Sequence, residues 1–179
     1  MLTLANARVF DGSAMRSARL DVAIADARIT AVGPPVGESP VSEPPASEPS
    51  TKRIDLHGMT LMPGLITCHL HPYFYRFSLA QGTAGERPGK ELPPGVLMAI
   101  GVRTCRVLLE SGFTGYIGAG CAHDIDAQLK MAIADSIMPG PRIRACGHHI
   151  GTTADLNDST LWWKRYRTPG IDLFADGPD

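Results

Sequence analysis

Two histidines one residue apart, His69 and His71, end the apolar run that begins at Leu61. Side chains alternate across a β-strand, so both imidazoles would lie on one face, about 7 Å apart along the strand, and Thr67 would share that face. Two imidazoles placed in this way can converge on a single metal ion above the end of the strand. The spacing alone also fits a pair that packs or meets solvent, so both interpretations stay open at this point.

Three further histidines follow predicted strands. His148 and His149 come after the stretch RIRACG, and His123 comes after FTGYIGAG. Each could contact a substrate at the end of its strand, although adjacent residues of an extended chain point to opposite faces, so at most one of His148 and His149 faces a pocket. The alternatives are that this pair caps a loop and that His123 caps the next helix together with Asp124.

The run WWKRYR, from Trp162 to Arg167, combines three aromatic residues with three cations. It could form a lid that packs on a substrate and holds its carboxylate through Arg167. Alternatively, the aromatic residues anchor a long loop while the cations face water. Basic and aromatic residues also alternate in nucleic-acid binders, but a net charge of −1 argues against that function.

The composition is that of a soluble globular protein of 179 residues, long enough for one sizeable core. The start of the chain lacks the basic and apolar regions of a signal peptide, and no window is apolar enough to span a membrane. The cysteines are widely spaced, which indicates reduced, buried thiols and a cytoplasmic location; they are Cys68, Cys105, Cys121 and Cys146.

Two kinds of segment organise the chain. Residues 1–62 contain short alternating strands with turns at Asp11–Gly12 and 25–27 and a further strand pair around His57–Gly58, which predicts part of a small β-sandwich. Within it, residues 34–51 are rich in Pro, Ser and Glu, and we expect a disordered insertion there.

From residue 63 to 179 the pattern becomes strand, loop, helix, repeated. One helix is predicted to end at Gly112, and a second to begin with Asp124 as its N-cap. Strands that alternate with helices predict an α/β class with a parallel sheet, either barrel-like or doubly wound. A complete (β/α)8 barrel needs about 250 residues, so this chain would supply about three of its eight strands and could not close the sheet.

At this point the sequence resembles a known family. The stretch DLHGMTLMPGLITCHLHP is similar to the strand-one signature of the amidohydrolase superfamily, in which a Pro-Gly and two apolar residues precede two metal-ligating histidines. LLESGFTGYIGAG and IMPGPRIRACGHHIGTT resemble the passages into its second and third strands, with the imidazolonepropionase-like and prolidase-like subgroup nearest. The resemblance implies a partial (β/α)8 barrel, about its first three βα units, after part of a β-sandwich. It also implies that His69 and His71 bind a divalent metal, zinc by default, as one or two ions.

The resemblance further implies an activity and a partner. The family hydrolyses amide or other C–N bonds, as in cyclic amides, N-acyl amino acids or dipeptides, by a metal-activated water. Its bridging lysine, two further histidines and catalytic aspartate belong to later strands, so we expect a second polypeptide to supply them and the assembled enzyme to form a homo-oligomer. Thr67 replaces a common aspartate, and TTADLND replaces a Gly-Gly-His-Gly run, which leaves the substrate class open.

Two other functions fit the same sequence. The chain could be a non-catalytic scaffold or pseudoenzyme subunit that binds a partner through its open sheet edge, because an unpaired edge favours association. It could also be a fragment with no function of its own.

Overall fold

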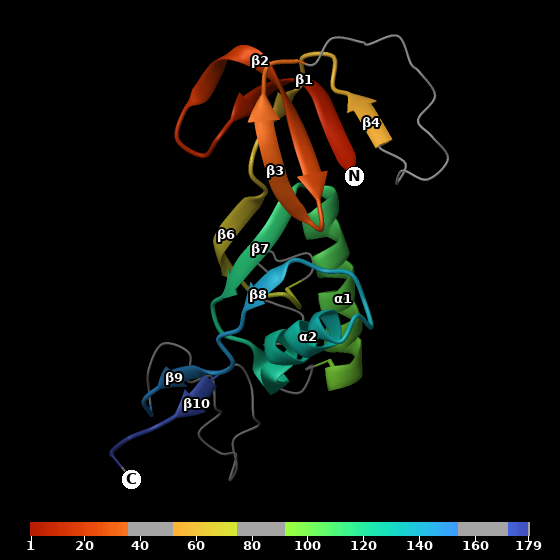
Figure 1. Cartoon of the computed structure of the whole chain (residues 1–179). Coiled ribbons are helices and arrows are strands. Elements are labelled where there is room, and N and C mark those ends of the chain that lie inside the picture. Colours follow the sequence, from red (N-terminus) through yellow and green to blue (C-terminus); the bar gives the residue numbers. More distant parts are fainter. Residues whose placement is uncertain (36–51, 75–91, 154–171, 179) are drawn as a thin grey trace. The chain divides into compact units, whose positions relative to one another are not determined.

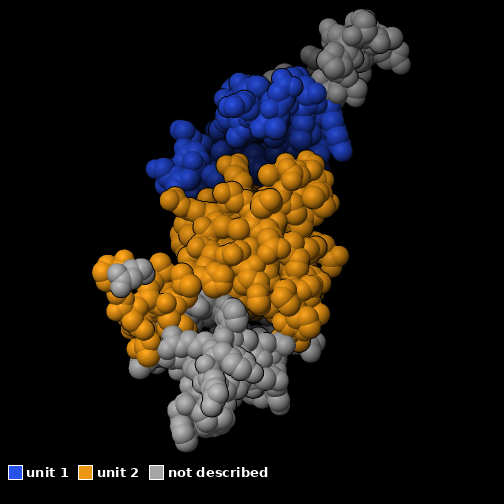
Figure 2. All heavy atoms as spheres, turned by 90° about the horizontal axis from the view of Figure 1, so that it is seen from below, with its two compact units in different colours: residues 1–63 blue, residues 64–179 orange. Residues whose placement is uncertain are grey.

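The computed structural model describes residues 1–35, 52–74, 92–153 and 172–178 of the chain. These residues divide into two compact units, Met1–Pro63 and Gly64–Asp179, which Figure 2 colours separately. The predicted insertion lies outside the described residues except for 34 and 35, and the aromatic and basic run that ends at Arg167 lies outside them entirely.

The first unit is a five-stranded sheet (Figure 1). Its strands follow the order β3-β2-β1-β4, and β5 also pairs with β1. The pairs β1–β2 and β2–β3 are antiparallel, which confirms the strands predicted in residues 1–33. The strands are β1 (Leu2–Phe10), β2 (Met15–Ala25), β3 (Arg28–Gly33), β4 (Lys52–Asp55) and β5 (Thr60–Leu61).

The strand pair predicted around His57–Gly58 is not a hairpin. Both β4 and β5 run parallel to β1 and pair with successive parts of its edge rather than with each other. The reason lies at Asn6, where β1 has a positive φ of 57° and its register with β2 shifts. The Asn6 carbonyl accepts the N–H of Gly58 at 2.8 Å, so the turn between β4 and β5 fills the irregular part of the edge.

The turn between β2 and β3 lies where the sequence predicted it. Asp26 and Ala27 both have positive φ, 50° and 57°. Two consecutive left-handed residues match the twist of a two-residue hairpin turn, where glycine is favoured at the second position.

Replacing Ala27 with glycine should therefore stabilise the first unit by up to about 1 kcal/mol, because alanine bears a steric cost in the left-handed region. Urea unfolding measures the change. The control is Ala23→Gly within strand β2, where glycine should cost about 0.5–1 kcal/mol. A loss of stability in the Ala27 variant would contradict the prediction.

The second unit contains a parallel three-stranded sheet in the order β6-β7-β8, with α1 in the first crossover and η1 and α2 in the second. A separate parallel pair, β9 with β10, follows it. The predicted α/β class and the alternation of strands and helices are thus confirmed. The elements are β6 (Leu65–Leu70), α1 (Pro94–Glu110), β7 (Phe113–Gly118), the short 3-10 helix η1 (Ala122–Asp124), α2 (Ile125–Ala134), β8 (Arg142–Arg144), β9 (His149–Gly151) and β10 (Asp172–Phe174).

Helix α1 ends and helix α2 begins where the sequence predicted. Gly112 follows the α1 C-cap with φ +83°, the left-handed conformation that ends many helices. Asp124 stands at the N-cap of α2, but it makes no side-chain capping hydrogen bond. Its carboxylate lies 3.2 Å from the Nδ1 atom of His148, so Asp124 is the N-cap residue by position, as predicted, but does not cap the helix through its side chain. Within the described residues, neither helix is long and apolar enough to cross a membrane.

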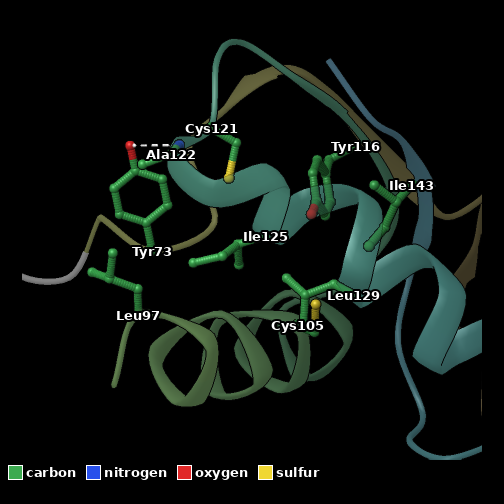
Figure 3. Close-up of a cluster of buried hydrophobic side chains, with 9 residues drawn as sticks. All are labelled: Tyr73, Leu97, Cys105, Tyr116, Cys121, Ala122, Ile125, Leu129 and Ile143. Atoms are coloured by element: carbon green, nitrogen blue, oxygen red, sulfur yellow. Dashed lines mark hydrogen bonds between the residues drawn. The ribbon is translucent and has the colours of Figure 1, made fainter. Parts of the chain in front are cut away.

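The core of the second unit lies between the sheet and its two helices, which cover the same side of the sheet in Figure 1. Tyr116 of β7 and Ile143 of β8 face Leu129 of α2 and Cys105 of α1, as Figure 3 shows. Gly101 permits a close helix approach, because a Cβ there would lie 2.8 Å from the Leu129 Cδ1 atom.

The hydroxyl of Tyr116 is buried and has no hydrogen-bond partner among the described residues. A buried polar group without a partner costs about 1–3 kcal/mol. Tyr116→Phe, which keeps the ring, should therefore leave thermal stability unchanged or raise it. Tyr116→Ala, the contrasting variant, should lose about 3–5 kcal/mol because it also leaves a cavity. A marked loss in the phenylalanine variant would show that the hydroxyl has a partner.

The four cysteines were predicted to be core residues, and two of them are. Cys105 and Cys121 are fully buried, whereas Cys68 and Cys146 are exposed. Cys68 lies on β6, an edge strand of the described sheet, and Cys146 lies in the loop after β8. Burial raises the pKa of Cys105 to about 11 and the pKa of Cys121 to about 12.

Stability should consequently fall in alkaline solution. Below pH 9 the thiols are protonated in both the folded and the unfolded chain. Between pH 9 and about 12 the unfolded chain releases protons that the folded chain retains, so each rise in pH favours unfolding. Urea midpoints measured between pH 7 and 11 test this. A double Cys105→Ala, Cys121→Ala variant should show a shallower decline, and an equal slope would contradict the assignment.

Candidate metal centre

The two histidines of the opening motif are neighbours in space at the C-terminal end of β6. Their ring centroids lie 5.1 Å apart, and the ring planes meet at 80°. His69 is exposed and His71 is half-buried. The pair is therefore close enough, and accessible enough, for both imidazoles to face one small ligand.

The His71 ring is held in a defined orientation. Its Nδ1 atom lies 2.9 Å from the carbonyl oxygen of Gly120, in the segment that follows β7. A carbonyl oxygen only accepts, so Nδ1 carries the proton and Nε2 keeps its lone pair for a metal ion. The Phe74 ring stacks on the His71 ring, with the two ring centroids 4.2 Å apart and the ring planes inclined by 20°. This tautomer and this support are those that a metal-ligating histidine needs.

The placement of Thr67 differs from simple alternation. The pairing of β6 with β7 shifts between Thr67 and Leu70, which lie opposite Tyr116 and Gly118. Tyr116 points into the helix-side core, so Thr67 is in register with that face rather than with the face of His69. Its hydroxyl donates a hydrogen bond to the His69 carbonyl at 3.2 Å, which spans the irregular part of β6.

The other predicted site histidines do not join this pair. His148 lies with its Nδ1 atom 3.2 Å from the Asp124 carboxylate, and His149 is exposed at the start of β9. His123 has φ 57°, and its carbonyl accepts a hydrogen bond from Gln128 at 2.7 Å. Over the described ranges, no three His, Cys, Asp or Glu side chains gather as a set of metal ligands.

A buried polar residue that the sequence analysis missed is Asp126. It is fully buried, and its carboxylate accepts the backbone N–H groups of Cys146 at 2.7 Å and Gly147 at 3.2 Å. A signal was available, because Asp126 lies three residues before the buried Leu129 and so on the apolar face of α2. An acidic residue on such a face indicates a buried polar contact.

The side of the β6–β7–β8 sheet opposite the helices carries a mixed surface. Ile66 and Ile117 are 65% and 36% exposed, and the exposed Arg142 and Arg144 alternate with the buried Ile143. A Cβ built on Gly115 would meet Ile66 Cγ1 at 3.5 Å and Arg142 Cβ at 3.9 Å, which places both side chains over this face. Among the described residues, neither arginine forms an ion pair.

Comparison with known proteins identifies the fold. No family model and no curated protein matches the sequence. Among solved structures, an amidohydrolase aligns with TM-score 0.71, 23% identity and 98% of this chain. A prolidase complexed with N-methylphosphonate-L-proline aligns with TM-score 0.74, 23% identity and 98% of this chain. The ochratoxinase of A. niger aligns with TM-score 0.67, 22% identity and 98% of this chain.

These alignments confirm the resemblance to the amidohydrolase superfamily at the level of the fold. The chain spans 41%, 40% and 41% of the lengths of those three proteins. It thus has the fold of an N-terminal portion of an amidohydrolase, as the sequence motifs implied.

Proposed function

We propose that the chain is the N-terminal part of a metal-dependent amidohydrolase that hydrolyses amide or other C–N bonds, with His69 and His71 as metal ligands. The observation that carries this proposal is the adjacent histidine pair, in which the Gly120 carbonyl fixes the tautomer of His71. Imidazole nitrogens suit a divalent transition metal, with zinc the default. When bound, such an ion lowers the pKa of water and polarises the carbonyl to be cleaved.

Two ligands do not complete a zinc site, which has three or four protein ligands. The remaining ligands and the catalytic residues would come from later strands. Those ligands would also determine whether the site holds one ion or two. In this chain, His71 would hold its Nε2 lone pair toward the ion because its Nδ1 proton is engaged. Phe74 would keep water from one side of that ring, since it stacks on it.

The substrate would be contacted from the loops at the same end of the parallel strands. His148 follows β8 at that end, with its Nδ1 toward Asp124, so its Nε2 atom is available to a substrate. We also propose His149, His123 and Arg167 as substrate contacts. Cyclic amides, N-acyl amino acids and dipeptides are the candidate substrates.

We further propose that β6, β7 and β8 are the first three strands of a (β/α)8 barrel whose other strands belong to a second polypeptide. Parallel sheets are normally covered on both faces, whereas helices α1 and α2 both pack on one face of this sheet. The complement should carry apolar side chains toward Ile66 and Ile117 and carboxylates toward Arg142 and Arg144, because buried charges require partners. The assembled enzyme would be a cytoplasmic homo-oligomer.

The test uses the chain purified from its own cells under native conditions. Mass spectrometry should show a stoichiometric second polypeptide. The complex should hydrolyse members of a panel of N-acyl amino acids, dipeptides and cyclic amides, lose activity with a chelator and regain it with zinc. A lone folded 19 kDa species without metal-dependent hydrolysis would overturn the proposal.

A second candidate function is a non-catalytic scaffold subunit, which the exposed Ile66 and Ile117 on the sheet also favour. The two functions differ in metal content. A stoichiometric complex that contains no divalent metal at the His69–His71 pair and hydrolyses none of the panel would favour the scaffold.

A further inference from the structure

A buried carboxylate joins the start of α2 to the loop that follows β8. Both oxygens of Asp126 accept backbone hydrogen bonds. Oδ1 accepts the N–H of Ala127 at 2.8 Å, and Oδ2 accepts those of Cys146 and Gly147 at 2.7 and 3.2 Å. Asp126 is fully buried, so these bonds form away from water, where hydrogen bonds to a charged acceptor are strongest.

The neighbouring backbone leaves room for this contact and reinforces it. A Cβ on Gly118, at the end of β7, would lie 2.7 Å from Asp126 Oδ2 and 3.1 Å from the Cys146 nitrogen. Only glycine at this position lets the carboxylate reach the loop. From the other side, the N–H of Cys121 donates to the Gly147 carbonyl at 2.6 Å. The backbone at Gly147 is therefore held through both its N–H and its carbonyl group.

His148 directly follows Gly147 in the chain. Gly147 has φ +72°, a conformation that turns the chain sharply, and a Cβ there would lie 3.1 Å from Asp124 Oδ1. The His148 ring meets that same Asp124 oxygen at 3.2 Å. The direction of the ring thus depends on where Cys146 and Gly147 are held.

We propose that Asp126 is a positioning residue for the substrate site. By holding Cys146 and Gly147, it aims the His148 ring so that Nδ1 faces Asp124 and Nε2 faces outward. The inference rests on the proposed function in one respect, namely that His148 contacts the substrate. The positioning itself concerns only residues of this chain, and it is tested separately.

A carboxylate is required at this position. Asparagine has the same shape, but its amide carries one acceptor and one donor group. In an Asp126→Asn variant, the side-chain NH2 group must therefore face either the N–H group of Ala127 or the two N–H groups of Cys146 and Gly147. One side of the contact would be lost whichever way the amide turns.

The experiment compares amide hydrogen exchange and histidine 15N spectra of the full chain. In Asp126→Asn, exchange at Cys146 and Gly147 should accelerate about 10- to 100-fold. The 15N signal of His148 Nδ1 should move toward that of an Asp124→Asn variant, in which the ring has lost its charged neighbour. Gly118→Ala, which displaces the carboxylate without changing any charge, should reproduce both effects.

Two controls separate positioning from general loss of stability. Asp135→Asn removes an exposed charge from the C-terminal end of α2 and should change neither readout. Ile143→Val destabilises the core beside the same loop and should leave the His148 signal in place. Unchanged exchange and an unchanged His148 signal in the Asp126 and Gly118 variants would overturn the inference.

The proposed function fails in a different way. If His148→Ala leaves substrate hydrolysis by the native complex intact, His148 is not a substrate contact, even when the spectra show that Asp126 holds the loop. If the spectra show no effect of Asp126 while His148→Ala reduces hydrolysis, the proposed function stands and the positioning inference is wrong.

Discussion

Alanine at both His69 and His71 is expected to abolish stoichiometric binding of a divalent metal by the native protein. Loss of a residue that only orients a metal ligand costs about 10- to 100-fold in affinity, and loss of two ligands should cost more than about 100-fold. Elemental analysis of the purified protein and titration with zinc after chelation measure the effect. His71→Ala alone should also be severe, because His71 is the ring with a fixed tautomer.

The matched control is His57→Ala. The His57 side chain is 81% exposed in the first unit, so its removal should leave the metal content unchanged. Retention of one bound ion in the double variant would place the metal elsewhere, and the enzymatic interpretation of the histidine pair would then fail.

Leu129→Ala should have the largest effect on folding. Leu129 of α2 is fully buried, and its side chain fills the space that Gly101 of α1 leaves open. Removing a buried leucine side chain costs about 2–5 kcal/mol, and the cost is greatest where neighbours cannot collapse into the cavity. Chemical denaturation monitored by circular dichroism measures the loss.

Met131→Ala provides the comparison on the same helix. Met131 is 64% exposed, so its replacement should change stability by less than about 0.5 kcal/mol. Equal effects of the two substitutions would mean that α2 does not pack on α1 through Leu129.

Local chemistry explains which elements could be predicted from the sequence. Gly112 marks the end of α1 because a left-handed residue is needed there, and glycine adopts that conformation without strain. Strand alternation predicted that His69 and His71 lie together, and the two rings are neighbours although β6 is irregular between Thr67 and Leu70 and ends before His71. The hairpin expected at His57–Gly58 was wrong because the pairing of β4 and β5 is decided by the irregularity at Asn6, which lies on a distant strand.

In the candidate site, too, the features that depend on residues distant in the sequence could not be predicted. The partner of His71 is the backbone carbonyl of Gly120, and a carbonyl group leaves no trace in the residue types of a sequence. The contact between His148 and Asp124 joins the loop after β8 to η1, and the parallel pairing of β7 with β8 brings these two segments together. Asp126 could have been recognised, since a carboxylate on the apolar side of a helix must find donors.

The two arginines on the face of the sheet opposite the helices affect how two copies of the chain would meet. If two copies met through that face, each would bring Arg142 and Arg144 into the interface, and the four like charges would repel. The isoleucines beside them would otherwise promote aggregation. We expect the guanidinium groups to oppose this self-association by charge repulsion, and concentrated salt should weaken the repulsion by screening it.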